Sequence, residues 1–267
     1  MHIGSAGHLM AIALRQCWIC GAPAQSREHR LKRSDLVRAY GKGPYTGPSV
    51  PLHVRNGKLT RIQGPGSDTV KYSHSLCQTC NSASTQPFDQ AYDTFVSWVQ
   101  AHESNVLLSR MINFQDVYGA NFETGQRNLF KYFVKSFGCR LFDAGLAVPR
   151  DLVDLLPLEG FRTALKLSMC VNEDVLLFPK ETRWRYIGKG ELTGYASRST
   201  PDSIQGYSWD ENTSWLTICF WYAHPPVETF GAPWIADSQH VYLGSVSPLT
   251  PEARAGFVEK LRRRSQP

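Results

Sequence analysis

The residues best suited to chemistry are four cysteines that fall into two pairs of identical spacing. Cys17 and Cys20 form one Cys-x-x-Cys pair, and Cys77 and Cys80 form the other. Each pair can present two thiolates from one tight turn, and two such turns supply the four ligands of a tetrahedral zinc ion. Four thiolates leave no open coordination position, so we expect one Zn²⁺ ion with a structural role. Four unrelated buried cysteines, or two redox pairs, are the alternative interpretations.

The two cysteine pairs are separated by a long segment. Fifty-six residues lie between Cys20 and Cys77, against about 15–20 in a simple zinc ribbon. A folded insertion must therefore separate the pairs, and a shared zinc ion would hold its two ends together. Within it, strand-like residues 50–55 and 59–62 flank Asn56-Gly57, a dipeptide that favours a two-residue hairpin turn. We therefore expect a β-hairpin in the insertion.

Three further polar residues lie close enough to the cysteine pairs to meet beside them. Glu28 and His29 follow Cys20 by eight and nine residues, and Asn81 directly follows Cys80. Carboxylate and carboxamide oxygens are hard ligands that suit Mg²⁺ or Mn²⁺, and imidazole can take a proton from water near neutral pH. A metal ion at such a site could neutralise charge on a phosphodiester and stabilise its leaving oxygen. The pattern thus predicts a hydrolytic site separate from the structural zinc.

The order of these motifs resembles the zinc-bearing branch of the HNH endonucleases, which have the ββα-metal fold. The resemblance covers residues 17 to about 100. The motifs that carry it are Cys17-x-x-Cys20-Gly21, Glu28-His29 and Leu76-Cys77-x-x-Cys80-Asn81.

The resemblance implies a role for each residue of the predicted site. His29 would be the general base that activates water, and Glu28 and Asn81 would hold one catalytic Mg²⁺ or Mn²⁺ ion. The substrate would be nucleic acid, with double-stranded DNA as the expected form, cut to leave a 3′-hydroxyl and a 5′-phosphate. A role in restriction or anti-phage defence is common among proteins that resemble this family.

Two features near the motifs leave alternatives open. The central asparagine of the family, which fixes the loop carrying the histidine, should lie nine residues before Asn81, where this chain has Tyr72. Ser73 or His74 could take over that contact, or His74 could join the catalytic site directly. Asp89 shares one face of a predicted helix with Asp93. It is either an additional metal ligand, a group that orients His29, or part of a solvated surface.

Positive charge is concentrated around these motifs. The 267-residue chain has a net charge of +6, but residues 1–72 contain eleven basic and three acidic side chains, and the rest contain eighteen and twenty. Arg27, Arg30, Lys32 and Arg33 adjoin Glu28-His29, and we expect them to line the path of a phosphate backbone rather than form a solvated face.

The elements that must position these residues can be predicted from the spacing of apolar side chains. Strands near 26–31 and 70–76 would carry the motif, a helix capped by Ser34 would cover 34–40, and another helix would follow Cys80. Helices would continue to about residue 170. The remaining predicted elements are strands over 184–187, 191–196, 207–209, 214–223 and 241–246, a turn at Asp210-Glu211-Asn212, and a helix over 251–264.

We therefore expect an α+β protein with an N-terminal extension over residues 1–14. A zinc-stabilised HNH nuclease domain would cover residues 15–110. Residues 111–267 would form a second domain of helices followed by antiparallel strands, which could recognise substrate, bind a partner or regulate the nuclease. A non-catalytic zinc-finger protein that binds nucleic acid is the alternative function, and a homodimer or a regulatory protein partner is compatible with either.

The composition restricts the environment in which the chain is expected to act. No apolar run approaches the length of about 20 residues that spans a bilayer, which argues against a membrane protein. The odd number of cysteines, seven, and the lack of a recognisable secretory signal favour a reducing compartment. We therefore expect a cytoplasmic location.

Overall fold

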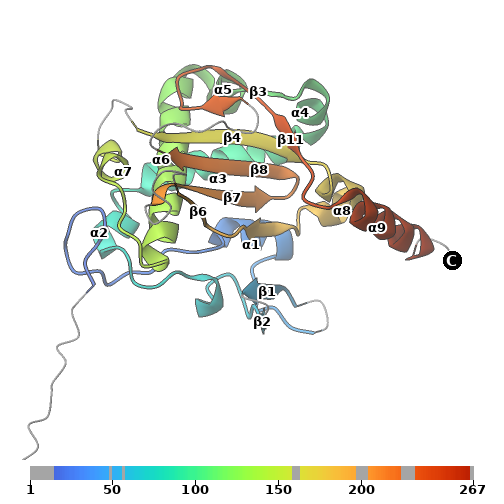
Figure 1. Ribbon diagram of the computed structural model, residues 1–267, viewed down its shortest axis with the longest axis horizontal. Coiled ribbons are helices and arrows are strands. Elements are labelled where there is room, and N and C mark those ends of the chain that lie inside the picture. Colours follow the sequence, from blue (N-terminus) through green and yellow to red (C-terminus); the bar gives the residue numbers. More distant parts are fainter. Residues whose placement is uncertain are drawn as a thin grey trace, which may run out of the picture.

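The computed structural model describes residues 15–47, 50–55, 58–157, 163–196, 204–223 and 232–264. They form a mixed α+β structure in which helices α3 and α6 lie behind a mainly antiparallel sheet (Figure 1). The α+β class predicted from the sequence is confirmed. The N-terminal extension and the turn dipeptide Asn56-Gly57 lie outside the described residues.

The largest sheet in the described part of the chain has seven strands. Their order is β11-β4-β8-β7-β5, with β6 paired to β7 and β9 paired to β4. Strands β11 and β4 are parallel, and the other pairs are antiparallel. The strands are β4 (Leu165–Asn172), β5 (Ile187–Lys189), β6 (Thr193–Ala196), β7 (Ile204–Thr213), β8 (Leu216–Ala223), β9 (Pro233–Trp234) and β11 (Gly244–Val246).

An aromatic core lies between this sheet and the long helix α6 (Phe122–Asp143). Alternate residues of β4 and β8 face α6, because successive side chains of a strand point to opposite faces. Phe133 and Phe137 of α6 lie against Phe220 of β8, with ring centroids 5.9 and 5.6 Å apart. Buried aromatic side chains contribute a large apolar area each, so this core dominates the stability of the chain.

Helix α3 (Gln86–Ala101), which follows Cys80 as the sequence predicts, joins the same core. Its Tyr92 stacks on Tyr132 of α6 with ring centroids 4.1 Å apart, and its Phe95 lies 6.3 Å from Phe114. The domain boundary expected near residue 110 therefore falls within one continuous core. The reason is that α3 buries its apolar face against α6 rather than against the cysteine-bearing segment.

The expectation that helices continue to about residue 170 is wrong, because Leu165 and Leu167 lie in β4. Strand β4 pairs with β8 and β9, so its alternate residues can all face α6 while the backbone satisfies its hydrogen bonds with neighbouring strands. A short apolar run of this kind is ambiguous between helix and strand until its neighbours are known.

The turn expected at 210–212 is also absent, because β7 continues to Thr213 and the chain reverses after it. These three polar residues favour a turn locally, but hydrogen bonds with other residues stabilise them in the strand. Glu211 accepts a hydrogen bond from Lys189 at 2.8 Å, and Asn212 accepts one from Thr217 at 2.6 Å. Tertiary contacts therefore keep a polar triplet inside a strand.

The other elements surround this core. Strand β3 (Met111–Asn113) pairs with β10 (His240–Tyr242), and α9 (Pro251–Arg264), predicted from the sequence, extends away from the body of the molecule (Figure 1). None of the described helices has the length and apolar character needed to cross a membrane. The remaining helices are α4 (Glu103–Ser109), α5 (Phe114–Tyr118), α7 (Arg150–Leu155) and α8 (Lys180–Arg183), with short 3₁₀ turns at Asp68–Val70, Gly119–Asn121 and Val175–Leu177.

Residues 15–81, which we call the cysteine region, contain little regular structure. The predicted hairpin is confirmed as β1 (Leu52–Arg55) paired with β2 (Lys58–Arg61). Helix α1 (Arg33–Tyr40) matches the predicted short helix and ends at Gly41, whose φ of +84° suits glycine. The expectation that Ser34 caps this helix is wrong. Its hydroxyl instead donates to Asp93 of α3 at 2.6 Å.

The predicted strands near 26–31 and 70–76 pair in antiparallel fashion but form only isolated bridges. Ser26 lies opposite Leu76, and His29 lies opposite Lys71. The backbone N–H of Tyr72 donates to the carbonyl of Glu28 at 2.9 Å. The two segments are thus held together in the expected order, with the bridge Ser26–Leu76 next to the second cysteine pair.

Candidate metal centre and catalytic pocket

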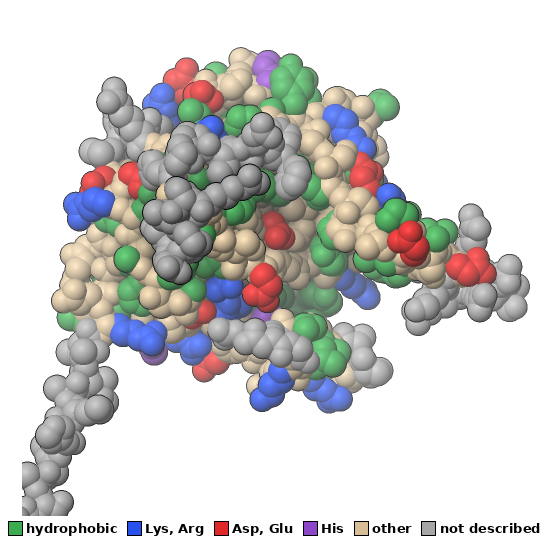
Figure 2. All heavy atoms as spheres, in the orientation of Figure 1, with side chains coloured by type: hydrophobic (Ala, Val, Ile, Leu, Met, Phe, Trp, Pro, Cys, Tyr) green, Lys and Arg blue, Asp and Glu red, His purple; other side chains and the backbone are tan. Residues whose placement is uncertain are grey.

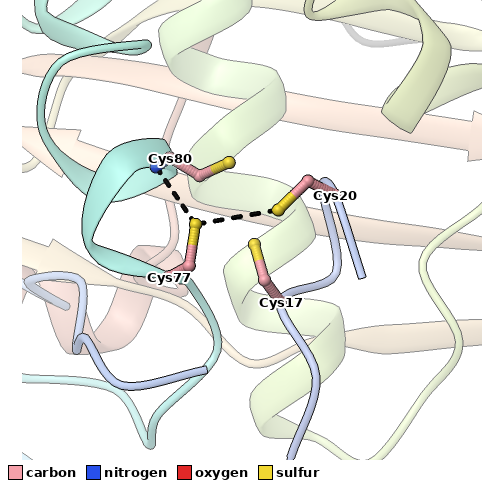
Figure 3. Close-up of side chains that lie close together, drawn as sticks. All are labelled: Cys17, Cys20, Cys77 and Cys80. Carbon is pink, nitrogen blue, oxygen red and sulfur yellow. Dashed lines mark hydrogen bonds between the residues drawn. The ribbon is translucent and has the colours of Figure 1, made fainter. Parts of the chain in front are cut away.

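The four cysteines of the two predicted pairs converge on one point, where they could hold a zinc ion. Their Sγ atoms all lie within 4.8 Å of one another, and the Sγ atoms of Cys20 and Cys77 are 3.7 Å apart. Figure 3 shows the four side chains directed towards a common centre. Cys17 and Cys20 come from the N-terminal turn, Cys80 from α2 (Gln78–Asn81), and Cys77 from the N-cap position of that helix. Among the described residues, no other group of three or more His, Cys, Asp or Glu side chains is arranged in this way.

Backbone hydrogen bonds shape both cysteine turns and favour the thiolate form of Cys77. The N–H of Gly21 donates to the carbonyl of Cys17 at 2.8 Å, and the positive φ of Gly21, +78°, lets the chain turn back. The N–H of Cys80 donates to the Sγ atom of Cys77 at 3.4 Å and lowers the pKa of the Cys77 thiol to about 7. A thiol with such a pKa is readily deprotonated, as metal ligation requires.

The cysteine turns also bring Glu28, His29 and Asn81 to one place. The N–H of Ser26 donates to the carbonyl of Leu76 at 2.8 Å, and the Asn81 side-chain amide donates to the Ser26 hydroxyl at 2.7 Å. Glu28, His29, Asn81 and Asp89 line one open pocket of about 770 Å³. We call it the site pocket. The juxtaposition predicted from the sequence is therefore present.

His29 is partly buried in this pocket and is held neutral by its surroundings. Burial lowers the pKa of the imidazole below its usual value; the carboxylate of Glu28 opposes this effect, while nearby Lys71 and Lys32 reinforce it. The Nε2 atom is buried and has no hydrogen-bond partner among the described residues. A neutral imidazole can accept a proton, as a general base must.

The carboxylates beside His29 are paired with two lysines. Glu28 lies 2.5 Å from the ammonium group of Lys135, and its other oxygen accepts the backbone N–H of His29 at 2.8 Å. Asp89 lies 3.3 Å from Lys135 and 2.6 Å from Lys32. Burial raises the pKa of Asp89, but the two ammonium groups outweigh it and lower the pKa below its usual value.

These pairs determine whether the expected Mg²⁺ or Mn²⁺ ion fits the residues present. Both oxygens of Glu28 and both oxygens of Asp89 already have a donor. Among the expected ligands, only the Oδ1 atom of Asn81 is buried without a partner in the described structure. One free amide oxygen does not make a site for a hard divalent cation, which prefers several oxygen ligands. The donor set as arranged does not fit the ion.

The four basic residues nominated from the sequence occupy different environments. Arg33 is exposed at the edge of the site pocket, and Arg27 lines the pocket while pairing with Asp68 at 3.0 Å. Lys32 is engaged by Asp89. Arg30 is buried and does not line the site pocket; its guanidinium lies 2.7 Å from Asp143. Arg33 and Arg27 are therefore placed to meet a phosphate, whereas Arg30 supports the fold.

The loop around Tyr72 is fixed by the second half of the chain rather than by Ser73 or His74 acting alone. Asp143, the last residue of α6, accepts the backbone N–H of Ser73 at 3.0 Å and pairs with Arg30. Arg30 in turn lies over the ring of Tyr72, 4.5 Å from its centroid. His74 is exposed and does not line the site pocket, so the structure does not bring it to His29.

Three residues near the site were not predicted from the sequence: Lys135, Asp143 and Lys42. Of these, only the exposed Lys42 lines the site pocket. A weak signal for Lys135 exists: Lys131 and Lys135 recur one helical turn apart among Phe130, Phe133, Val134 and Phe137. Charged residues in such an apolar helix face need partners when buried. Nothing in the spacing, however, indicates that Glu28 and Asp89 are those partners.

Comparisons with known proteins do not assign the chain to a family. No family model matches it, no curated protein matches it, and no solved structure matches it.

Proposed function

We propose that the chain is an endonuclease of the HNH type that hydrolyses phosphodiester bonds in nucleic acid, with DNA as the expected substrate. The observation that carries the proposal is the convergence of Glu28, His29 and Asn81 in one pocket beside a four-cysteine cluster. That convergence requires the two cysteine pairs to meet, which they do across a long insertion. The antiparallel pairing of residues 26–30 with 70–76, followed by a helix, is consistent with the ββα arrangement.

In this proposal His29 is the general base. Its lowered pKa keeps the ring neutral at pH 7, so the imidazole can accept a proton as a water molecule attacks the phosphorus. The bond from phosphorus to the 3′ oxygen breaks, solvent protonates that oxygen, and the products are a 3′-hydroxyl and a 5′-phosphate. Glu28 helps to fix the main chain that carries the base, because its carboxylate accepts the backbone N–H of His29.

The basic rim of the site pocket supplies the phosphate contacts. Exposed Arg33 and Lys42 line the pocket, and Arg27 lines both this pocket and a neighbouring one that includes Lys58 and Lys71. On the face seen in Figure 2, Lys and Arg side chains are conspicuous around the lower part of the molecule, where hairpin β1–β2 lies in Figure 1. Such groups neutralise phosphates along a strand and position it over His29.

No catalytic step is assigned to a divalent cation, because the carboxylates that would bind it are already paired with lysines. A bound Mg²⁺ or Mn²⁺ ion would supply charge neutralisation at the scissile phosphate. The four-cysteine cluster has no such role, since a zinc ion with four thiolate ligands is coordinatively closed.

Digestion of plasmid DNA, single-stranded DNA and RNA tests this function directly. The zinc-loaded full chain should cleave single- or double-stranded DNA or RNA in at least one condition of a series with Mg²⁺, Mn²⁺ or EDTA. His29→Ala should reduce the rate by about 10²–10⁴-fold, the usual contribution of a general base, while His102→Ala should not. His102 is a matched control, since it is exposed at the end of α3. Full activity of folded His29→Ala protein would refute the mechanism.

A non-catalytic zinc-finger protein is the second candidate, favoured by the pairing of Glu28 with Lys135, which leaves the expected metal ligand occupied. Such a protein would bind nucleic acid through Arg27, Arg33 and Lys42 without cutting it. Binding without cleavage in every metal condition, and equal binding by wild type and His29→Ala, would select this alternative. A role in restriction or anti-phage defence stays a prediction.

A further inference from the structure

Lys135 is a lysine inside the molecule. Its side chain is 2% exposed, and on α6 it lies two residues from Phe133 and from Phe137, which fill the core between this helix and the sheet. Burial of an isolated ammonium group is strongly unfavourable, so a buried lysine needs compensating charge. Burial alone would lower the pKa of Lys135, but the carboxylates of Glu28 and Asp89 outweigh it and raise that pKa above its usual value.

The compensating charges come from two different segments. Glu28 belongs to the motif beside the first cysteine pair, and Asp89 belongs to α3 after the second pair. The Lys135 Nζ atom lies 2.5 Å from a Glu28 oxygen and 3.3 Å from an Asp89 oxygen. Lys32 contacts the other oxygen of Asp89 at 2.6 Å. The two carboxylates are therefore matched by two ammonium groups.

This arrangement leaves no net negative charge to attract a divalent cation. Two carboxylates and two ammonium groups sum to zero. The other charged residues that line the pocket are four cations and one carboxylate, Arg27, Arg33, Arg38, Lys42 and Asp93, so the net charge around it is positive. A divalent ion entering between Glu28 and Asp89 would have to displace the ammonium group of Lys135 or share the carboxylates with it at close range, where like charges repel strongly.

We propose that the ammonium group of Lys135 occupies the position between Glu28 and Asp89 that a divalent ion bound by these two carboxylates would need. Lys135 is a positioning residue in this role. It holds Glu28, which in turn accepts the backbone N–H of His29. The catalytic meaning of this contact rests on the proposed function, but the competition between Lys135 and a metal ion does not.

The competition can be measured as Mn²⁺ binding to the zinc-loaded full chain, for example by the loss of the free Mn²⁺ signal in electron paramagnetic resonance. Lys135→Met removes the ammonium group and frees one oxygen of each carboxylate, so it should tighten Mn²⁺ binding by about tenfold or more. Lys131→Met is a matched control: Lys131 lies one turn away on α6, is also buried and has its ammonium group over the ring of Phe88.

A double substitution tests whether the gain in Mn²⁺ affinity depends on Glu28. Glu28→Gln combined with Lys135→Met should abolish the tighter Mn²⁺ binding, since the amide cannot replace the carboxylate. Equal Mn²⁺ affinity in wild type and Lys135→Met, or an equal gain in Lys131→Met, would overturn the proposal.

A measurement on the wild type keeps the proposal testable if Lys135→Met fails to fold. The ¹H–¹⁵N signal of a buried, ion-paired ammonium group should be visible at neutral pH, because exchange with water is slow. Millimolar Mn²⁺ should leave that signal unbroadened, and selective broadening would contradict the proposal. Neither readout is cleavage, so loss of the proposed nuclease function and loss of this inference can be distinguished.

Discussion

The cysteine region and the rest of the molecule achieve order by different means. Residues 86–246, which we call the helix–sheet core, enclose a large aromatic cluster between α6 and the sheet. The cysteine region buries two small apolar clusters. One is formed by Leu31, Leu36, Ile62 and Val70, and in the other Tyr72 and Leu76 pack beside the cysteines. Its structure depends instead on the cysteine cluster and on contacts with α3 and α6. A segment with so little apolar area cannot offset its conformational entropy by hydrophobic burial alone.

The cysteine region contacts both α3 and α6. Ser34 and Lys32 pair with Asp93 and Asp89 of α3, and further contacts are with α6. Lys135 pairs with Glu28, Asp143 pairs with Arg30, and the ring of Trp18 lies against Gly138. The helix whose aromatic face builds the core thus presents its other face to the candidate site. The helix–sheet core contains most of the buried apolar residues, and the cysteine region contains most residues of the candidate site, so perturbing each should have separable effects.

Removal of zinc should have the largest effect, and it should be confined to the cysteine region. Structural zinc sites in small peptides contribute about 10–16 kcal/mol of apparent binding free energy, which is also folding free energy. A chelator, or Cys17→Ser, should abolish hydrogen-exchange protection of residues 15–81 while residues 122–143 stay protected. Exchange measured by mass spectrometry, with zinc content measured in parallel, checks this.

The matched control for that experiment is Cys170→Ser. Cys170 is buried in β4, outside the cysteine cluster. This variant should keep its zinc and the protection of residues 15–81. Retained protection of the cysteine region after complete zinc loss would show that the cluster is not its structural centre.

Substitutions of apolar residues should lower the free energy of unfolding more in the helix–sheet core than in the cysteine region. Phe137 is completely buried and stacks on Phe220, so Phe137→Ala should lower the free energy of unfolding by about 3–5 kcal/mol. Leu59 on hairpin β1–β2 is 62% exposed, so Leu59→Ala should change it by less than about 0.5 kcal/mol. Urea unfolding followed by tryptophan fluorescence measures both values, and similar losses would remove the distinction between the regions.

The same contrast explains what the sequence could predict. Ligand spacing on tight turns is local, so Cys17, Cys20, Cys77 and Cys80 could be identified without knowledge of the fold. Glu28, His29 and Asn81 adjoin those turns and could be placed near one another for the same reason. Helix α3 and hairpin β1–β2 could be predicted because periodicity and a turn dipeptide are local signals.

What could not be predicted depends on distant pairing. The role of Lys135 requires knowing that α6 passes beneath Glu28, and the turn expected at Asp210-Glu211-Asn212 is cancelled by partners on other elements. Arg30 resembles its basic neighbours in sequence, yet Asp143 draws it inside. Such contacts carry no periodicity or spacing that sequence reasoning could detect.

A substitution at the junction between the regions should be destabilising where helix propensity alone predicts a gain. Replacing glycine by alanine inside a helix stabilises it by up to about 1 kcal/mol. At Gly138, however, an added Cβ would lie 2.6 Å from the ring of Trp18. We expect Gly138→Ala to cost about 1–3 kcal/mol, as overpacking usually does.

Thermal unfolding of Gly138→Ala, alone and combined with Trp18→Ala, measures that clash. The double variant should lose the penalty specific to Gly138→Ala, because the ring is gone. Additive effects of the two substitutions would show that Trp18 and α6 do not pack together.

The acid limb of the cleavage rate should follow His29. A general base must be deprotonated, and burial lowers the pKa of His29 below 6.5, so the rate should fall as pH drops through that lowered pKa and be flat above it. Below the pKa the loss should approach about tenfold per pH unit. A rate profile whose acid limb lies above pH 6.5 would contradict burial as the dominant influence on the ring.

Arg33→Ala should have the smallest effect, since it removes one surface charge from the cysteine region. Within the described residues Arg33 has no ion-pair partner, and it lines the site pocket at the start of α1. If it contacts one phosphate, the slope of log affinity against log salt should become shallower by about 0.9 for double-stranded DNA. Arg150→Ala, an exposed arginine on α7 that pairs with Asp154, should leave the slope unchanged. Equal slopes in both variants would place the nucleic acid away from α1, and a larger change in Arg150→Ala would move the binding surface to the helix–sheet core.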